Sequence, residues 1–207
     1  RDVAPSRGLG DVYKRQAFTT STGYGIAKYD NPEELSVSDR NNIGYQYTDC
    51  PLYWISVIYL NFAEAKAEMG SLTQDDLNNS INKLQARAGL PAMTTTPDAD
   101  PANNMGVSNL IWEIRRCRRC ELIMDNWYRY WDLIRWHQLD KLDSTKYPNT
   151  MLGANVSNVP DCEEATKNGY IDASDAQIRT YEAKHYFYPI PTTQLTLNKN
   201  MKQNPGW

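Results

Sequence analysis

Two helical segments joined by only a few residues place the strongest restriction on the fold of this chain. The first is predicted to begin near Pro51, which a first helical turn tolerates, with Asp49 before it as a plausible cap. Gly70 is a natural end for this helix. The second begins at Thr73, and Asp76 three residues on approximates a capping box. Because the link is so short, the two helices are expected to run antiparallel.

Apolar residues repeat at helical spacing in both segments, so each helix is predicted to bury one face. In the first segment they are Trp54, Val57, Ile58, Phe62, Ala65 and Met69. In the second they are Leu77, Ile81, Leu84 and Ala88, and the helix ends at Gly89 and Pro91. The hairpin of residues 52–88 has about the length of one tetratricopeptide unit. A single unit cannot bury its own apolar face, so stacked neighbours are expected.

A second helical hairpin is predicted further along the chain. Residues 91–108 form a long polar loop, after which a helix begins near Ser108 or Asn109, both good caps. The apolar pattern that follows is too long for one average helix, so we expect a break near residues 125–126 and an end around Leu139. One broad face is expected to contain Leu110, Ile114, Cys117, Met124, Trp131 and Ile134.

The two ends of the chain predict less regular structure. Residues 140–186 are mostly polar with scattered turn signals, which indicates loops and short pieces. The prolines within 186–191 favour an extended segment, followed by a short helical turn at 192–195. Residues 1–16 show no periodic pattern, so we expect a non-native or flexible lead-in there and a domain that spans 17–207.

Composition excludes several classes of protein. The apolar fraction is 41% and the charged fraction 23%, which is typical of a globular chain and not of a disordered one. The formal net charge of −3 gives no broad surface for nucleic acid or anionic membrane. No run of about 18 apolar residues is present, and the start shows no signal peptide or lipidation signal. Four cysteines are too few for a disulfide scaffold.

The aromatic residues are unevenly chosen, with 14 Tyr and 6 Trp against 3 Phe. Tyr and Trp have an apolar face and a polar edge, which suits half-wet grooves and the stacking of sugar rings, although core packing is an equal alternative. Trp127 and Trp131 are four residues apart on one helical face and are predicted to lie in the core. The better candidates for ligand contact are tyrosines in loops: Tyr24, Tyr45, Tyr47, Tyr147 and Tyr170.

The most basic run of the sequence is Arg115, Arg116, Arg118 and Arg119. A nucleic-acid patch is one interpretation. However, residues four apart share a helical face, so the run divides around the helix. We favour a solvated helix face with ion pairs to Glu113 and Glu121.

Cys117 and Cys120 form a CxxC motif. Zinc needs about four ligands, and no second pair stands at suitable spacing. Thioredoxin-like chemistry favours a strand before the helix, where this chain has a polar loop. Both cysteines are therefore predicted to pack on the apolar side of the helix. His137 and His185 are isolated in the sequence and are expected at the surface or in hydrogen bonds.

Glycoside hydrolysis needs two carboxylates that face one bond. The candidates here are Glu64, Glu68, Asp125 and Asp132. Glu64 and Glu68 are expected on a solvated helix flank beside Lys66, and Asp132 is expected in a structural ion pair with Arg129 or Arg135. The sequence therefore predicts no catalytic residue and no metal site.

Three motifs follow one another in a specific order. Residues 60–65 (LNFAEA) are followed by 87–90 (RAGL), then 118–122 (RRCEL) through 130–136 (YWDLIRW), then 188–191 (YPIP) through 203–207 (QNPGW). Their order, spacing and place at the chain end resemble the SusD/RagB family over about residues 20–207.

The sequence departs from the family pattern at several positions. Trp54 and Val57 stand where the family usually has Arg and Glu, and Cys117 stands where Glu precedes the Arg pair. One extra residue lies between Glu121 and Asp132. These changes affect the local salt bridges and the helix register, because the motifs concerned resemble structural ones.

The resemblance implies a mainly α fold of tetratricopeptide-like helical hairpins with loop-rich insertions, of which this chain is the C-terminal portion. Members of the family are lipid-anchored at the outer membrane, face outward, and deliver oligosaccharides or other nutrients to a TonB-dependent, SusC-like transporter. We therefore expect a nutrient-binding protein, without enzymatic activity or a cofactor, whose lipid anchor is absent from this fragment. Much of the family's binding surface lies in insertions and in the N-terminal region, so the resemblance assigns no binding residue here.

Two other functions remain open at this point. A generic tetratricopeptide-like interaction module would have a peptide groove and no sugar affinity, but such modules do not end in PIP…QNPGW. A glycoside hydrolase would need a carboxylate pair across a cleft. If helices of a longer protein normally cover the apolar faces, the isolated fragment is expected to be poorly soluble or partly disordered.

Overall fold

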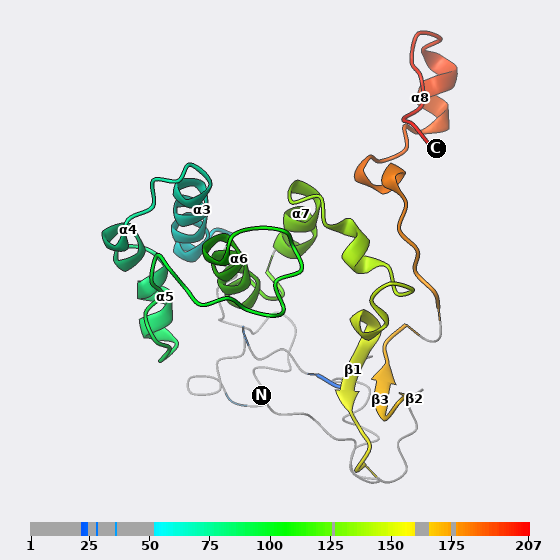
Figure 1. Cartoon of the computed structure of the whole chain (residues 1–207). Coiled ribbons are helices and arrows are strands. Elements are labelled where there is room, and N and C mark those ends of the chain that lie inside the picture. Colours follow the sequence, from blue (N-terminus) through cyan, green and yellow to red (C-terminus); the bar gives the residue numbers. More distant parts are fainter. Residues whose placement is uncertain are drawn as a thin grey trace. The chain divides into compact units, whose positions relative to one another are not determined.

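The computed structural model describes residues 22–24, 28, 36, 52–125, 127–159, 166–174 and 177–207. They fall in two compact units (Figure 1). Residues 52–138 form the first, which we call the helical unit, and the remaining described residues form the second, the strand unit. The chain is mostly helical with one small sheet, which confirms the predicted fold class.

The first helix of the helical unit is α3 (Ile55–Glu68). It begins after Trp54, later than predicted, and has no side-chain cap. Asp49 and Pro51 lie outside the described residues. Its predicted end is confirmed: Gly70 has a φ of 67°, and the Ser71 N–H donates to the Lys66 carbonyl over 2.9 Å, which completes a glycine-terminated helix end.

The second predicted helix is divided into α4 (Gln74–Asn78) and α5 (Ile81–Arg87). The capping box of Thr73 and Asp76 is confirmed. The prediction of one continuous helix is wrong, because Ser80 leaves helical geometry and its hydroxyl donates to the Asp76 carbonyl. A side-chain bond of this kind competes with the helical ladder. Gly89, with a φ of 67°, follows the end of α5.

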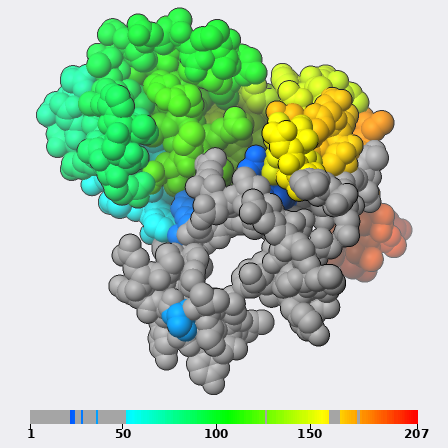
Figure 2. Space-filling view, turned by 90° about the horizontal axis from the view of Figure 1, so that it is seen from below, coloured from blue at the N-terminus to red at the C-terminus, as the bar shows by residue number. Residues whose placement is uncertain are grey.

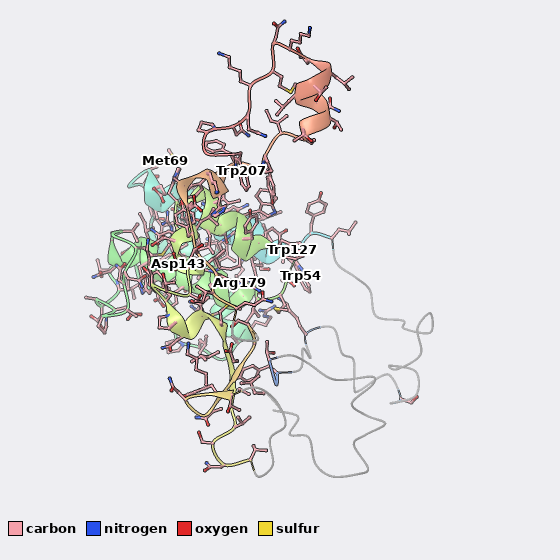
Figure 3. The ribbon with its side chains drawn as sticks, turned by 90° about the vertical axis from the view of Figure 1, so that its right-hand side faces the viewer. Trp54, Met69, Trp127, Asp143, Arg179 and Trp207 are labelled. Carbon is pink, nitrogen blue, oxygen red and sulfur yellow. The ribbon has the colours of Figure 1, made fainter. Side chains whose placement is uncertain are left out.

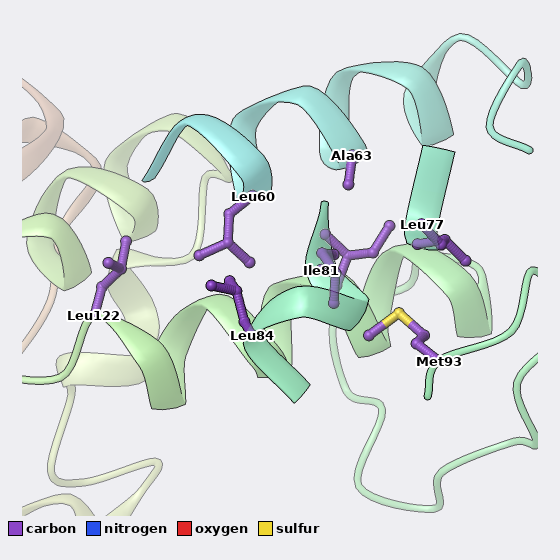
Figure 4. Close-up of a cluster of buried hydrophobic side chains, with 8 residues drawn as sticks. Leu60, Ala63, Leu77, Ile81, Leu84, Met93 and Leu122 are labelled. Carbon is purple, nitrogen blue, oxygen red and sulfur yellow. The ribbon is translucent and has the colours of Figure 1, made fainter. Parts of the chain in front are cut away.

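The core of the helical unit lies between α3 and α4–α5 on one side and α6 (Asn109–Glu121) on the other (Figure 4). Its buried members are Leu60, Ala63, Leu77, Ile81, Leu84, Met93, Ile114 and Leu122. Met93 belongs to the predicted polar loop, whose backbone is fixed here by Asn82: the Asn82 side chain accepts from the Met93 N–H over 2.7 Å and donates to its carbonyl over 3.1 Å.

The face of α3 that the apolar pattern selected is mostly not the buried one, which corrects the prediction. Ile58 is 62% exposed and Phe62 is 42% exposed, and Ile55, Ala65 and Met69 are exposed as well. The buried side of the helix instead carries Ser56, Leu60, Ala63 and Glu64. The helix therefore has apolar residues on two sides, and the contacts of the fold decide which side is buried.

The second hairpin forms as predicted, with differences at its ends. Ser108 caps α6 by accepting from the Ile111 N–H, and α7 (Tyr128–Arg135) follows after the expected break. The helix ends at Arg135 and not near Leu139. The predicted shared face is wrong at Met124, which is exposed in the link with a φ of 62°.

The tryptophans of the second hairpin are also placed differently. Trp127 is 81% exposed and Trp131 is 54% exposed, so neither lies in the core. Trp127 is the residue before α7 and has a left-handed backbone (Figure 3). Trp136 is the aromatic residue that is buried here.

The strand unit contains a three-stranded antiparallel sheet that the sequence reading did not predict. Its strands are β1 (Leu152–Asn155), β2 (Thr166–Lys167) and β3 (Tyr170–Asp172), in the order β1-β3-β2. Their atoms form a joined yellow and orange patch in the space-filling view (Figure 2). Two 3₁₀ helices, η2 (Leu139–Leu142) and η3 (Pro148–Met151), precede β1.

One face of this sheet packs against residues 22–24. A Cβ on Gly23 would lie 2.7 Å from Cδ1 of Ile171 and 2.9 Å from Cβ of Ala154, so only glycine fits this contact. The Ala154 N–H donates to the Thr22 carbonyl over 2.8 Å. Because side chains alternate along a strand, the residues beside Ile171 in β3, Tyr170 and Asp172, point to the opposite face.

The C-terminal segment is extended and ends in a turn, as predicted. It contains η4 (Ala183–Tyr186) and α8 (Thr192–Leu197), the second at the expected helical turn. The Gln203 side chain accepts from the Ile190 N–H over 2.8 Å and donates to the Ile190 carbonyl over 2.9 Å. The Trp207 indole donates to the Phe187 carbonyl over 3.0 Å. No helix among the described residues has the length and apolar character needed to cross a bilayer.

Candidate functional site

An ionic cluster with two buried carboxylates joins α3, α6 and α7 in the helical unit. We define it as Glu64, Arg115, Arg118, Asp132 and Arg135. Glu64 accepts from Nε of Arg115 over 3.0 Å and from the Arg135 guanidinium. Asp132 accepts from Nε of Arg118 over 2.7 Å and from Nε of Arg135 over 3.1 Å. Each carboxylate therefore has two guanidinium partners.

The partners of Glu64 favour the charged form of its carboxylate. Burial raises the pKa of Glu64, but the hydrogen bonds from Arg135 and Trp136 and the positive charges of Arg135 and Arg115 outweigh burial and lower it. The general acid of a glycosidase needs the opposite, a carboxyl that keeps its proton near neutral pH. We therefore assign the cluster a structural role. The predicted ion pair of Asp132 with Arg135 is confirmed, and Arg118 is a second partner of Asp132.

The cluster corrects two predictions about exposure. Glu64 is buried and does not lie on a solvated flank, whereas Glu68 is half exposed and binds Arg115 over 2.9 Å. Arg118 is buried and the Arg115 side chain is only 10% exposed, so the arginine run is not a solvated face throughout. The predicted pair of Arg116 with Glu113 is confirmed.

The other residues considered as ion-pair partners or ligands do not come together in one site. Glu121 pairs with Arg87 over 2.6 Å. Cys117 packs against the core, and burial raises the pKa of its thiol to about 12, so it does not act as a nucleophile near neutral pH. Cys120 is exposed, against the prediction. Nδ1 of His185 accepts from the Glu182 N–H over 3.0 Å, as expected for a hydrogen-bonded histidine. Within the described ranges, no three His, Cys, Asp or Glu residues gather as a metal site.

The tyrosines predicted to contact a ligand are not brought together. Tyr45 and Tyr47 lie outside the described residues. Tyr147 is half-buried, with Nζ of Lys141 located 5.4 Å from its ring centre. Tyr24 belongs to the segment that packs on the Ile171 face of the sheet, and Tyr170 points to the other face. Tyr24 and Tyr170 are both exposed, but they do not form one aromatic platform.

A pocket of 220 Å³ lies beside the sheet in the strand unit, and we call it the sheet pocket. Its polar lining residues are Ser144, Thr145, Lys167, Asp172, Ser174 and Gln177, and its apolar ones are Pro148, Met151, Leu152 and Ile178. Drug-sized ligands occupy about 300–1,000 Å³. This volume therefore suits one small polar unit, such as a single sugar ring, and the lining offers both apolar and hydrogen-bonding side chains.

Backbone contacts fix the walls of the sheet pocket. The Ser144 N–H donates to the Arg179 carbonyl over 2.9 Å, and the Arg179 N–H donates back to the Ser144 hydroxyl over 3.0 Å. Asp143, labelled with Arg179 in Figure 3, accepts from the N–H groups of Thr145 and Tyr181 over 2.9 and 3.1 Å. The hydroxyl bond from Thr145, followed by these backbone bonds, lowers the pKa of Asp143 to about 2.

The hairpin that presents one wall has a recognisable turn. Asn168 and Gly169 connect β2 to β3, with φ values of 54° and 78°. Two positive φ angles in a two-residue loop are the signature of a type I′ hairpin, and Asn-Gly is its preferred sequence. The sequence predicts only loops and short pieces over 140–186. The Asn-Gly dipeptide is the sequence signal that predicts this hairpin. The hairpin in turn places Lys167 and Asp172 on neighbouring strands.

Comparison with known proteins identifies related folds. The chain is similar to a SusD-like protein (BF3747) from Bacteroides fragilis NCTC 9343, with 25% identity, a TM-score of 0.51, and coverage of 73% of this chain and 25% of that one. It is also similar in fold to BT4246, with 23% identity, a TM-score of 0.54, and coverage of 75% of this chain and 23% of that one. The chain thus spans about a quarter of the solved structures it matches. No match is found among curated proteins.

The sequence profile of the SusD family matches residues 2–207. This range includes the residues expected to be a lead-in, and the boundary at residue 16 stays a prediction. The three motifs that suggested the family lie at structural positions: residues 60–65 in α3, 118–122 in and after α6, and 188–191 before α8. Sequence and fold agree, and the chain belongs to the SusD family.

Proposed function

We propose that this chain is part of a protein that binds an oligosaccharide or another nutrient at the cell surface and delivers it to a TonB-dependent transporter. The family match over residues 2–207 carries the proposal. The proposed protein is held outward-facing at the outer membrane by a lipid anchor and breaks no bond in its ligand. The carboxylates Glu64 and Asp132 support binding without catalysis, because both are engaged in ion pairs with arginines.

The sheet pocket is the candidate place for ligand contact in this part of the protein. Sugars present hydroxyl groups at their edges and C–H groups on their faces, and the pocket offers hydroxyls, an amide and apolar side chains in one small volume. Tyr170 is 37% exposed and shares a sheet face with Lys167, its partner across the hairpin. A tyrosine ring in this position can extend the contact beyond the pocket.

A glycan-array screen of the chain, with an assay for released reducing ends, tests the proposal. We expect retention of at least one oligosaccharide without cleavage, and weaker retention by Tyr170→Ala. Phe187→Ala is the matched control, because Phe187 is an exposed aromatic residue of the same unit that does not line the pocket. Cleavage of the ligand would contradict the proposal, and binding of no glycan would contradict an oligosaccharide as the nutrient bound by this part of the protein.

A second candidate is a tetratricopeptide-like interaction module. It is favoured by the exposed row Ile55, Ile58, Phe62, Ala65 and Met69 of α3, whose spacings alternate between three and four residues. Such a row is typical of a helix that packs against another helix. If this candidate is correct, we expect the chain to bind an amphipathic helical peptide, as measured by fluorescence anisotropy. We also expect Ile58→Gln to weaken that binding, and no glycan to be retained.

A further inference from the structure

The hairpin of β2 and β3 places two opposite charges on the wall of the sheet pocket. Lys167 pairs directly with Tyr170, and Asp172 lies two residues further along β3. Residues that pair directly, and those two apart on one strand, point to the same face of a sheet. Both Lys167 and Asp172 line the pocket, and they form no ion pair with each other.

The side chains of Lys167 and Asp172 differ in the hydrogen bonds that they already form within the protein. Asp172 accepts from the Ser174 N–H over 3.0 Å and from the Ser174 hydroxyl over 2.6 Å. Its carboxylate is thus partly satisfied within the protein. Lys167 has no ion pair or hydrogen bond from its ammonium group among the residues that the structure describes. Its three donors remain available to a ligand.

We propose that the sheet pocket takes a saccharide unit that carries an anionic substituent, a uronate carboxylate or a sulfate ester, and that Lys167 is the cation that binds it. This inference rests on the proposed function and names the class of its ligand. The anionic group is paired with Lys167, and the ring hydroxyls lie against Ser144, Thr145 and Gln177. Asp172 accepts a hydroxyl and cannot pair with the ligand's anion, which fixes the orientation of the sugar.

The charge arrangement explains why a neutral sugar would fit less well. An ammonium group is strongly hydrated, and a neutral ligand that covers it removes water without supplying a counter-charge. A carboxylate or sulfate replaces that water with charge-assisted hydrogen bonds, which are stronger than those between neutral groups. A sugar with an anionic substituent should therefore bind at this position more tightly than a neutral sugar.

Isothermal titration of the chain with matched ligands tests the proposal. The uronate pair is trigalacturonate and its neutral methyl ester, and the sulfate pair is a carrageenan oligosaccharide and its desulfated form. We expect the acid of at least one pair to bind about tenfold more tightly than its neutral counterpart, and the pair that shows this preference identifies the substituent. The preference should shrink as salt is raised from low ionic strength, since the site is open to solvent.

Variants distinguish Lys167 from other cations. Lys167→Gln should abolish the preference for the acid, because it weakens binding of the charged ligand and removes the ammonium group that a neutral ligand would desolvate. Lys199→Gln, an exposed lysine that does not line the pocket, should change neither. Equal binding of charged and neutral forms, or an unchanged preference in Lys167→Gln, overturns the proposal. If the chain binds only neutral glycans, nutrient binding stands and this inference falls, whereas binding of no glycan removes both this inference and an oligosaccharide as the nutrient bound by this part of the protein.

Discussion

Arg118 donates from Nε to Oδ2 of Asp132 over 2.7 Å, and both side chains are 5% exposed. The arginine is in α6 and the aspartate is in α7, so their bond connects the two helices of the second hairpin. Nη1 of Arg118 also donates to the Asn61 side chain of α3 over 2.8 Å. One guanidinium thus joins three helices, and it does so inside the fold, where an unpaired charge is costly.

Asp132→Asn should therefore strongly destabilise the chain. The substitution keeps the shape but leaves the buried Arg118 without its counter-charge, which costs about 3–5 kcal/mol when one partner of a buried pair is removed. Urea unfolding followed by circular dichroism measures this loss. Arg116→Gln is the control, because it breaks the partly exposed pair with Glu113 and should change stability by about 0–1 kcal/mol. Equal effects of the two substitutions would show that the buried pair has no special role.

Glu64 should make stability depend on pH in the acid range. Burial raises its pKa, but the partners Arg135, Trp136 and Arg115 lower it further than burial raises it, so the folded value lies below the unfolded one. The unfolded state therefore binds the proton more readily. The stabilisation is complete above the ordinary glutamate pKa of about 4.3 and is lost as the pH falls through the lowered folded value.

The corresponding measurement is the free energy of unfolding between pH 3 and pH 7 for the chain and for Glu64→Gln. We expect the variant to be less stable at pH 7 and its stability to fall less steeply below about pH 4.3, since it no longer has this titrating group. A variant whose pH profile runs parallel to that of the unchanged chain would contradict the assignment.

The two apolar sides of α3 should respond differently to substitution. Leu60 is fully buried in the core cluster, so Leu60→Ala should cost about 2–5 kcal/mol. Ile58 faces away from that cluster and is largely exposed, so Ile58→Ala should change stability by about 0.5 kcal/mol or less. Thermal unfolding of both variants provides the comparison. A large loss in Ile58→Ala would mean that this side is covered in solution, for example by a second copy of the chain, and sedimentation would test that case.

Local signals in the sequence predicted four of the helix ends correctly. Gly70, Gly89, Ser108 and the capping box of Thr73 act on residues within one turn, so their effect can be read from neighbouring residues. The break of α4 from α5 was missed although Ser80 is a polar residue in an apolar pattern, because a serine forms such a side-chain bond in some helices and not in others.

Contacts between residues far apart in the chain could not be predicted from the sequence. Glu64 is buried because Arg115 and Arg135, located 51 and 71 residues further along, neutralise it, and a carboxylate beside Lys66 gives no sign of this. Similarly, Ile58 and Leu60 are equally apolar, and only the position of α6 decides which of them is buried. The sheet pocket combines residues from 144 to 178, whose proximity depends on the pairing of β1 with β3.

The turn of the hairpin should control the sheet pocket. Gly169 has a φ of 78°, and a Cβ there would lie 2.1 Å from the Ser157 hydroxyl oxygen. Gly169→Ala should therefore open the hairpin and speed hydrogen exchange of the Val156 N–H, which donates to the Gly169 carbonyl over 2.8 Å. Gly106→Ala, at a φ of 66° with no atom within 4 Å of the added Cβ, is the control that carries only the backbone cost of about 1–2 kcal/mol.

The double variant Gly169→Ala with Ser157→Ala separates the two causes. Removal of the Ser157 hydroxyl takes away the 2.1 Å contact, together with its bond to the Gly169 carbonyl over 3.3 Å, but leaves the left-handed backbone strain. If the clash opens the hairpin, the double variant should regain slow exchange at Val156 and lose only about as much stability as Gly106→Ala. If exchange stays fast in the double variant, the positive φ alone requires glycine at this turn, and Lys167 and Asp172 depend on that backbone conformation for their place in the pocket wall.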